Sequence, residues 1–241
     1  MTAILRKEII GNQTLILGDC LKVMPELGRF DAVVTDPPYG IGYSPGGGGG
    51  GITDSNGKRY EKRFTGKDLV IGDDGPFDPL PILALGLPTI MWGGNHFASR
   101  LPDSKAWLIW DKRRGTTVND FADVEIAWSN LRTPARCLPH LWNGMLRDSE
   151  RAVPRVHATQ KPIAVMEWCL GFLPDAKTIL DPFMGSGTTL VACQRMGRAG
   201  TGIELDPDYF EIACRRVDEA ARQPDLFIAP KPAAPKQETL L

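Results

Sequence analysis

Short apolar runs, each bounded by glycine, proline or polar residues, recur along the chain and are typical of buried strands. They lie at residues 13–17, 30–34, 88–95, 106–110, 124–128, 178–180 and 199–204. Apolar residues at helical spacing predict helices at residues 20–27, 79–87, 161–170, 190–196 and 207–221. This alternation predicts an α/β fold on a parallel sheet, with 106–110 and 124–128 as an antiparallel pair near the sheet edge.

One rigid polar stretch directly follows an apolar run. Thr35-Asp36-Pro37-Pro38-Tyr39 comes after residues 30–34. Its prolines fix φ and bias the residue before each of them away from helix, so the backbone leaves the strand as a stiff turn. Because strand ends of α/β sheets open onto the ligand crevice, we expect Asp36, backbone carbonyls and Tyr39 to hold a flat heterocycle bearing an amine. The alternative is an ordinary proline-rich turn with an N-capping aspartate.

A glycine-rich turn follows a later run. Residues 178–180 lead into Asp181-Pro182-Phe183-Met184-Gly185-Ser186-Gly187-Thr188-Thr189, and the next predicted strand ends at Glu204. Such a turn lets backbone approach a ligand closely, and an acid on the next strand suits two ribose hydroxyls. No lysine follows Gly187 as in a P-loop, and Leu190 stands where a dinucleotide site has a third glycine. The pattern favours a phosphate-free nucleoside such as S-adenosylmethionine over NAD or a nucleoside triphosphate.

Composition favours one large domain. The chain has 241 residues, 42% of them hydrophobic, which suffices for a full core. Its net charge is −1, yet residues 58–67, 112–114 and 131–161 are basic, so nucleic acid stays open as a partner. The five cysteines are scattered, which argues against a metal site or a disulfide framework and for a reduced cytoplasmic protein. We expect no membrane span and no export, because no long apolar run or signal pattern is present.

Two segments interrupt the single domain predicted over residues 1–222. Residues 41–67 contain six consecutive glycines and predict a flexible loop, either a lid that orders on substrate or a tolerated insertion. Residues 131–156 are irregular and arginine-rich, which suggests a small target-recognition insert. We expect basic residues of both segments to contact phosphates and a base edge, with a short or relaxed recognition sequence. Residues 223–241 predict a disordered tail.

The two motifs together resemble those of the DNA amino-methyltransferases. The likeness is to the group in which D-P-P-Y, here residues 36–39, precedes F-x-G-x-G, here residues 183–187. Further likeness lies at residues 17–20, 157–162 and 202–206, in the family's order. The resemblance implies a Rossmann-like S-adenosylmethionine-dependent fold, which is a permuted, seven-stranded, mostly parallel sheet with helices on both faces.

The resemblance also assigns roles to single residues. It implies that Asp36, Pro37, Pro38 and Tyr39 are catalytic. It implies that no metal takes part and that S-adenosylmethionine is held by Asp19, Cys20, Asp36, Thr159, Lys161, Pro162, Asp181, Phe183, Gly185, Ser186, Gly187, Thr188, Glu204 and Leu205.

The reaction that the family implies is methylation of an exocyclic amino group on a base flipped out of double-stranded DNA. Asp36 and the Pro37 carbonyl would accept the amino hydrogens and orient the nitrogen lone pair, while Tyr39 would stack on the base. Aspartate at the first motif position favours adenine-N6 over cytosine-N4, which stays the alternative. Rival hypotheses are methylation of RNA or of a protein glutamine, and an inactive DNA-binding regulator. The resemblance also suggests a bacterial or phage origin and leaves open a partner endonuclease, as in restriction-modification systems.

The tail contains Gln223-Pro224-Asp225-Leu226-Phe227, which resembles the short peptide by which bacterial replication proteins bind the sliding clamp. The alternative is that Leu226 and Phe227 fold back onto the core. A second copy of the chain is a further candidate partner.

Histidines and tryptophans carry weaker signals. We expect surface or packing roles for His96, His140 and His157, which lack metal-ligand spacing. Core positions are expected for Trp107, Trp110 and Trp128.

Overall fold

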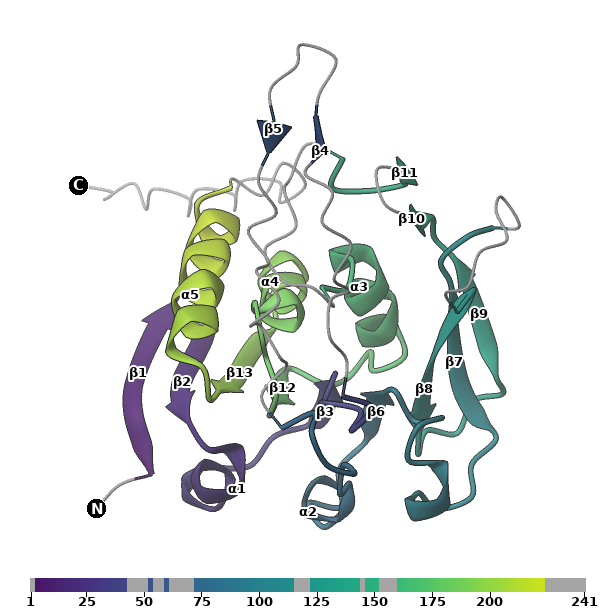
Figure 1. Ribbon diagram of the computed structural model, residues 1–241. Helices are drawn as coiled ribbons and strands as arrows, with labels where there is room; N and C mark the ends of the chain where they lie inside the picture. Colours follow the sequence, from purple (N-terminus) through teal and green to yellow (C-terminus); the bar gives the residue numbers. More distant parts are fainter. Residues whose placement is uncertain are drawn as a thin grey trace, which may run out of the picture.

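The computed structural model of the chain describes residues 3–42, 72–114, 122–143, 146–151 and 160–223, with the backbone of 52–53 and 59–60. Its main feature is a nine-stranded sheet in the order β1-β2-β13-β12-β3-β6-β8-β7-β9 (Figure 1). These strands are β1 (Ile4–Ile10), β2 (Gln13–Gly18), β3 (Ala32–Thr35), β6 (Thr89–Trp92), β7 (Ala106–Asp111), β8 (Val124–Ser129), β9 (Arg136–Pro139), β12 (Thr178–Asp181) and β13 (Ala199–Glu204). Two short antiparallel pairs lie outside it, namely β4 (Ile52–Thr53) with β5 (Arg59–Tyr60) and β10 (Trp142–Asn143) with β11 (Leu146–Arg147).

The centre of the sheet is parallel and buried on both faces. Strands β2, β13, β12, β3 and β6 run in one direction, and every residue of β3 and β6 is buried. Burial on both faces explains why their sequences are continuous apolar runs rather than alternating ones. Strands β7 and β8 form the antiparallel pair that the sequence predicts. The predicted α/β class with a mostly parallel sheet is therefore confirmed.

The strand count differs from the seven implied by the resemblance. Strand β1 pairs antiparallel with β2 at one edge, and β9 pairs parallel with β7 at the other. Charged residues fill the middle of β1, and three of the four residues of β9 are exposed. Hydrophobic patterning therefore gives little strand signal at either edge, and β9 lies in a segment predicted to be irregular.

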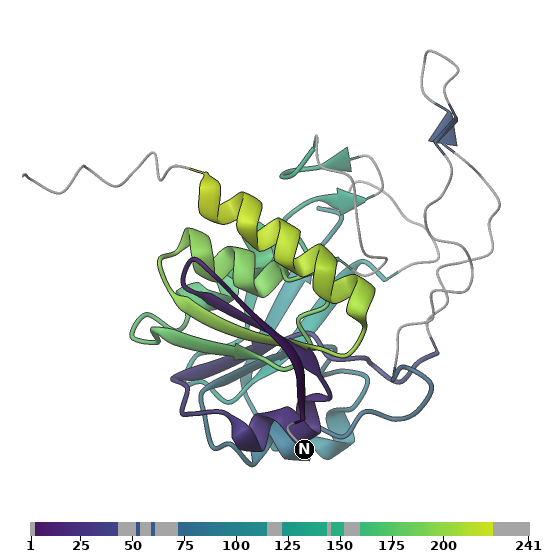
Figure 2. The ribbon, with the colours of Figure 1, turned by 90° about the vertical axis from the view of Figure 1, so that its left-hand side faces the viewer.

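Helices cover both faces of the sheet, as predicted. Helices α3 (Ile163–Gly171), α4 (Thr188–Arg195) and α5 (Pro207–Arg222) lie on one face, and α1 (Cys20–Val23) and α2 (Leu80–Leu83) on the other (Figure 1). Figure 2, seen from the β1 side, shows the long α5 crossing over the sheet. Two 3-10 turns, Met24–Glu26 and Ala98–Arg100, extend the second face. Each face has its own apolar cluster, with Leu170 and Phe210 in one and Val23 and Ile82 in the other.

The order of the strands creates a crevice at the middle of the sheet. Strands β3 and β12 are neighbours, but the chain continues from β3 to β6 on one side and from β12 to β13 on the other. In α/β sheets, ligands bind at such a reversal, beyond the carboxyl ends of the strands. The polar stretch after β3 and the glycine turn after β12 both begin at this point.

Several sequence predictions lie outside the described residues. These are most of the glycine-rich loop, His157 and Thr159, and the tail beyond residue 223 with the clamp-like Asp225, Leu226 and Phe227. Within the described ranges, no helix is both long and apolar enough to cross a membrane. All five cysteines are described, and none is in a disulfide, as the sequence predicts.

Gly202 on β13 tests how tightly the sheet packs beneath the glycine turn. A Cβ at this position would lie 2.5 Å from the Met184 sulfur and 2.8 Å from a methyl carbon of Leu190. Gly202→Ala should therefore lower the free energy of unfolding by about 1–3 kcal/mol, the usual cost of overpacking a core. Urea unfolding measures this loss. Gly28→Ala is the matched control, because a Cβ there meets no atom within 4 Å. Equal unfolding midpoints for the two variants would contradict the packing argument.

Candidate functional site

A cavity of about 1070 Å³ opens at the carboxyl ends of the central strands. It joins the polar stretch after β3 to the glycine turn after β12. The sequence-predicted site residues that line it are Asp19, Cys20, Asp36, Pro37, Pro38, Tyr39, Lys161, Asp181, Phe183, Gly185, Ser186, Thr188, Glu204 and Leu205. Pro162 and Gly187 are not in its lining and instead precede helices α3 and α4. Thr159 lies outside the described residues.

A buried hydrogen bond joins the ends of β3 and β12. The Thr35 hydroxyl donates to Asp181 Oδ1 at 2.7 Å, and the Phe183 N–H donates to the same oxygen at 3.2 Å. Burial raises the pKa of Asp181 to about 6, against hydrogen bonds from Thr189 and Thr35 that favour the carboxylate. Asp181 therefore fixes the start of the glycine turn relative to Asp36, the residue that follows Thr35.

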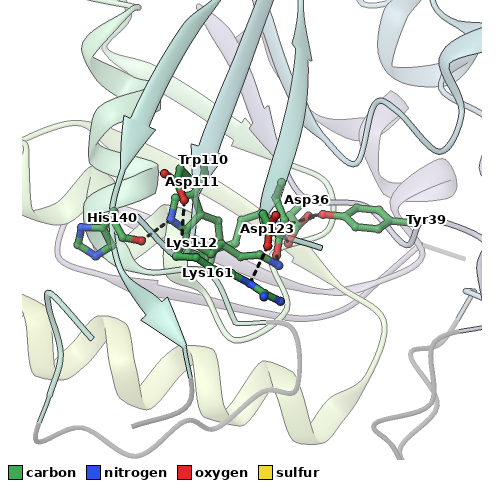
Figure 3. A network of polar contacts seen from close by, with 10 residues as sticks. Asp36, Tyr39, Trp110, Asp111, Lys112, Asp123, His140 and Lys161 are labelled. Carbon is green, nitrogen blue, oxygen red and sulfur yellow. Dashed lines mark hydrogen bonds and ion pairs between the residues drawn. The ribbon is translucent and has the colours of Figure 1, made fainter. Parts of the chain in front are cut away.

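Asp36, Tyr39 and Lys161 form a closed set of polar contacts (Figure 3). The Tyr39 hydroxyl donates to Asp36 Oδ1 at 2.7 Å, and the Lys161 ammonium donates to that hydroxyl at 2.9 Å. Lys161 also pairs with Asp36 Oδ2. Burial, followed by the nearby Asp36, keeps the pKa of Tyr39 well above its ordinary value, so the hydroxyl stays a donor. The two prolines stiffen the turn that brings the acid and the phenol together.

Glu125 and Lys112 complete the charge balance of this cluster. Lys161 Nζ lies 3.2 Å from Glu125 Oε2, and Lys112 Nζ lies 3.1 Å from Glu125 Oε1. Burial alone would lower the pKa of Lys161 and raise that of Glu125. The opposite charges outweigh it, so the pKa of Lys161 is raised and that of Glu125 is lowered. For Asp36, burial has the larger effect and raises the pKa, with Lys161 opposing it.

The Tyr39 ring is held by the turn that follows β6. It stacks on His96, with ring centroids 4.9 Å apart and planes inclined by 15°. Gly93, at φ +74°, lies against the ring edge, where a Cβ would come within 2.1 Å of a Tyr39 carbon. Only glycine combines this left-handed backbone with the space that the ring needs. His96 lines the cavity, and its contact with Tyr39 agrees with the predicted surface or packing role.

The chain that leaves Tyr39 is held by Asp73, which the sequence reasoning missed. Asp73 Oδ1 accepts the N–H groups of Gly40 at 2.7 Å and Ile41 at 3.3 Å, and its carbonyl accepts the N–H of Gly42 at 2.9 Å. Asp73 is only 4% exposed. It therefore anchors the end of the D-P-P-Y turn, residues 36–39, to the chain that follows the glycine-rich loop. An isolated aspartate carries no local signal for such a role.

Glu204 lies at the opposite end of the cavity, beside the glycine turn. Its carboxylate accepts the N–H groups of Gly185 at 2.8 Å, Asp206 at 2.8 Å and Leu205 at 3.0 Å. Burial raises the pKa of Glu204 to about 7, although these backbone hydrogen bonds favour the ionised form. The acid is thus pointed into the cavity and tied to the turn that it faces.

Arg216 of α5 holds the other half of the glycine turn. Its guanidinium donates to the Ser186 carbonyl at 2.6 Å, the Ser186 hydroxyl at 2.8 Å and the Thr188 hydroxyl at 3.1 Å. Gly187, at φ +79°, lies against α5, where a Cβ would come 3.0 Å from Ala213. The hydroxyls of Ser186 and Thr188 therefore anchor the turn to α5. A helix residue that supports a distant turn cannot be recognised from spacing.

Two cations predicted to belong to a basic surface are buried. Lys161 is 4% exposed and paired as described above, and Arg113 is 4% exposed and lies 3.1 Å from Asp123. Arg132, Arg136 and Arg151 are exposed, as a phosphate-contacting role requires. Lys161 and Arg113 therefore add no charge to an exposed basic surface, although both lie in segments that are basic in sequence. Trp110, expected in the core, is buried there and also lines the cavity, together with Trp142.

Comparison with known sequences shows a partial similarity to one family. The model of the DNA methylase family matches residues 101–215, which include Lys161, the glycine turn and Glu204 but not Asp36. The chain is 38% identical over 82 residues to the type II methyltransferase M2.LlaDCHI of Lactococcus lactis subsp. cremoris, over 34% of this chain and 30% of that protein. It is 40% identical over 86 residues to M.ScaI of Streptomyces caespitosus, over 35% of this chain and 27% of that protein. The matches thus span less than a third of these relatives.

Solved structures share the fold. The M1.HpyAVI–SAM complex matches with a TM-score of 0.51 at 19% identity, over 86% of this chain and 99% of that one. The PvuII DNA methyltransferase, which is cytosine-N4-specific, matches with a TM-score of 0.56 at 14% identity, over 88% and 89% of the two chains. At these identities the likeness concerns the fold alone. The chain is thus similar to the DNA methylase family over residues 101–215 and shares its fold with solved DNA methyltransferase structures.

Proposed function

We propose that the protein methylates DNA, transferring a methyl group from S-adenosylmethionine to the exocyclic N6 amino group of a flipped adenine. One observation carries the proposal, namely that a single cavity joins Asp36 and Tyr39 to the Gly185 turn and Glu204. An amine held at one end can then meet a methyl donor held at the other. The match of residues 101–215 to the DNA methylase model supports the reaction class, and the activity and substrate of the whole protein belong to this proposal.

The residues around the glycine turn fit S-adenosylmethionine. Among the described lining residues, the Glu204 end carries the acids Asp19, Glu204 and Asp206, whereas the lining cations Lys112, Arg113 and Lys161 belong to the Asp36 end. A phosphate-bearing nucleotide would meet carboxylates there, and a ribose diol would meet an acceptor. Phe183, Ile203 and Leu205 supply apolar wall for an adenine ring. We propose that Glu204 holds the ribose, with the predicted residues of the turn around it.

The chemistry follows from what each end of the cavity can hold. When bound, S-adenosylmethionine supplies an electrophilic methyl group on a sulfonium that leaves as a neutral thioether. The Asp36 carboxylate and the Pro37 carbonyl accept the two amine hydrogens, which orients the nitrogen lone pair. Asp36 is also placed to take the proton that the amine loses, because its pKa is raised by burial. Tyr39 holds Asp36 through its hydroxyl and offers its ring to the base.

Adenine-N6 is proposed over cytosine-N4 because Asp36 stands at the first position of the motif, where the cytosine enzymes more often carry serine. Cytosine-N4 remains the second candidate, because the structural neighbours include a cytosine-N4-specific enzyme. The two bases present the same amine, so Asp36 serves either.

The test of the function is transfer of a radiolabelled methyl group to DNA, RNA and protein substrates, followed by mapping of methylated bases in DNA from cells that express the protein. We expect label in DNA alone and at adenine within a defined sequence. Radiolabel in RNA or protein, or methylation mapped at cytosine, would contradict adenine in DNA as the substrate.

Asp36→Ala should abolish most methyl transfer and leave cofactor binding intact. The substitution removes an acceptor that fixes the amine, and the loss of one such preorganised group costs about 100- to 1000-fold in rate. Single-turnover methylation measures the rate, and calorimetry with S-adenosylmethionine measures binding. Asp36→Asn is the matched control, because it keeps one acceptor oxygen and should retain more activity. Undiminished transfer by Asp36→Ala would overturn the assigned role.

Affinity for S-adenosylmethionine should rise with pH. Glu204 accepts ribose hydroxyl hydrogens best as a carboxylate, and its pKa is raised to about 7 in the free protein. Below that pKa the group is protonated, so the dissociation constant should fall about tenfold between pH 6 and pH 8 and then level off. Glu204→Gln should bind more weakly and without this dependence. A wild-type constant that does not change over this range would contradict the ribose role of Glu204.

A further inference from the structure

Both carboxylate oxygens of Asp36 already have partners in the cavity. Oδ1 accepts the Tyr39 hydroxyl, and Oδ2 pairs with Lys161. Lys161 in turn directs its ammonium at three oxygens, which belong to Asp36, to Tyr39 at 2.9 Å and to Glu125 at 3.2 Å. An ammonium has three N–H donors, so all three are engaged. An amine that donates to Oδ2 therefore arrives where a Lys161 N–H now donates, and that N–H needs a new acceptor.

The target bases carry such an acceptor beside the amine. In adenine the carbon that bears N6 also bears N1, and in cytosine the carbon that bears N4 also bears N3, each a ring nitrogen with a free lone pair. We propose that Lys161 donates to this ring nitrogen, so that Asp36 and Lys161 together recognise the donor–acceptor edge of the base. This inference rests on the proposed function. In the exchange, the amine replaces Lys161 at Oδ2 while the released N–H meets the ring nitrogen, and no hydrogen bond is lost.

The surroundings keep Lys161 charged and in place. Its side chain is 3% exposed and lies 5.2 Å from the centroid of the Trp92 ring, which attracts a cation. Glu125 also pairs with Lys161 and is itself held by Lys112. Asp36 and Glu125 raise the pKa of Lys161 over the opposing effect of burial. The ammonium is therefore a permanent donor that stays anchored to Glu125 and Tyr39 while it exchanges one partner.

The pair formed by Asp36 and Lys161 also explains how the site can exclude guanine, whose hydrogen-bonding edge differs from that of adenine. Guanine that presents its Watson–Crick edge carries an N–H at N1 beside its amine, and the acceptor on the other side of the amine, N3, lies next to the glycosidic bond to the sugar. Two donors would then face Asp36 and Lys161, and the Lys161 N–H would meet another hydrogen. A buried donor without an acceptor is costly, so guanine is rejected. Adenine and cytosine both present a donor beside an acceptor, so Asp36 and Lys161 can bind either base. Discrimination between the two must come from other contacts.

The test uses a duplex oligonucleotide containing the sequence that the protein methylates in cells. The target adenine is replaced by 1-deazaadenine, which keeps the amine but lacks N1, or by 7-deazaadenine, which keeps both. We expect single-turnover methylation of the 1-deaza duplex to be roughly 10- to 100-fold slower than that of the 7-deaza duplex, the effect of losing a hydrogen bond to a charged donor. Removing N1 weakens base pairing and eases flipping, which acts in the opposite direction. If mapping gives cytosine, 3-deazacytosine and 5-methylcytosine form the matched pair.

Lys161→Met provides the second arm. This variant should be slow on every duplex, and its rates on the 1-deaza and 7-deaza duplexes should be nearly equal, because the donor to N1 is gone. The comparison cancels any change that N1 removal makes to the intrinsic reactivity of the amine. Equal rates of the wild-type protein on the two duplexes would overturn the inference without any variant. Weakened S-adenosylmethionine binding in Lys161→Met, with wild-type discrimination retained, would assign Lys161 to the cofactor instead. Absence of transfer to every duplex, including unmodified adenine, would refute the proposed function itself.

Discussion

The hydrogen bond from Thr35 to Asp181 is the constraint on which the site depends. It links the last residues of two parallel strands at the point where the strand order reverses. The D-P-P-Y turn and the glycine turn therefore start side by side. Each turn is then fixed at its far end by a separate partner, Asp73 for the first and Arg216 for the second. Two loops distant in sequence thereby act as the walls of one cavity. The proposed methyl transfer would need this rigidity, because a reacting pair must be held near its attack geometry.

The buried charges beside Asp36 are the second requirement. Burying an ion is costly unless a partner of opposite charge and further hydrogen bonds compensate for lost water, and removing one partner of a buried pair typically costs about 3–5 kcal/mol. Here Asp36, Lys161, Glu125 and Lys112 alternate in sign and share contacts, so each charge has a partner. Such a cluster contributes little net stability compared with apolar packing. Its position at the cavity wall suits the proposed binding of a polar base edge that exchanges places with one of its members.

The sequence predicts the parts of the site whose signal is local. Asp36 and Tyr39 are recognisable because prolines stiffen a turn at the end of an apolar run, and Gly185 and Glu204 because a strand, turn, helix and strand follow in order. Lys161 was predicted at the site, but its partnership with Tyr39, 122 positions away, follows only from the packing of α3 against the sheet. Glu125, Asp73 and Arg216 give no local signal at all. The edge strands were missed for a related reason, since exposed strands lack an apolar run.

The distribution of charge along the cavity also bears on how two different ligands are told apart. Among the described residues, the lining acids at the β2 and β13 end, Asp19, Glu204 and Asp206, have no lining cation beside them, whereas Lys112 and Lys161 at the other end are balanced by Glu125 and Asp36. A sulfonium-bearing nucleoside without phosphate is favoured at the acidic end. A nucleotide within DNA brings phosphates that the carboxylates of this end would repel, whereas the end around Asp36 and Lys161 is charge-balanced and does not repel them in this way. In the proposed reaction, two different sets of charges therefore separate the two ligands: the acids of the β2 and β13 end disfavour a phosphate-bearing ligand in the cofactor half, and the paired Asp36 and Lys161 contact the base.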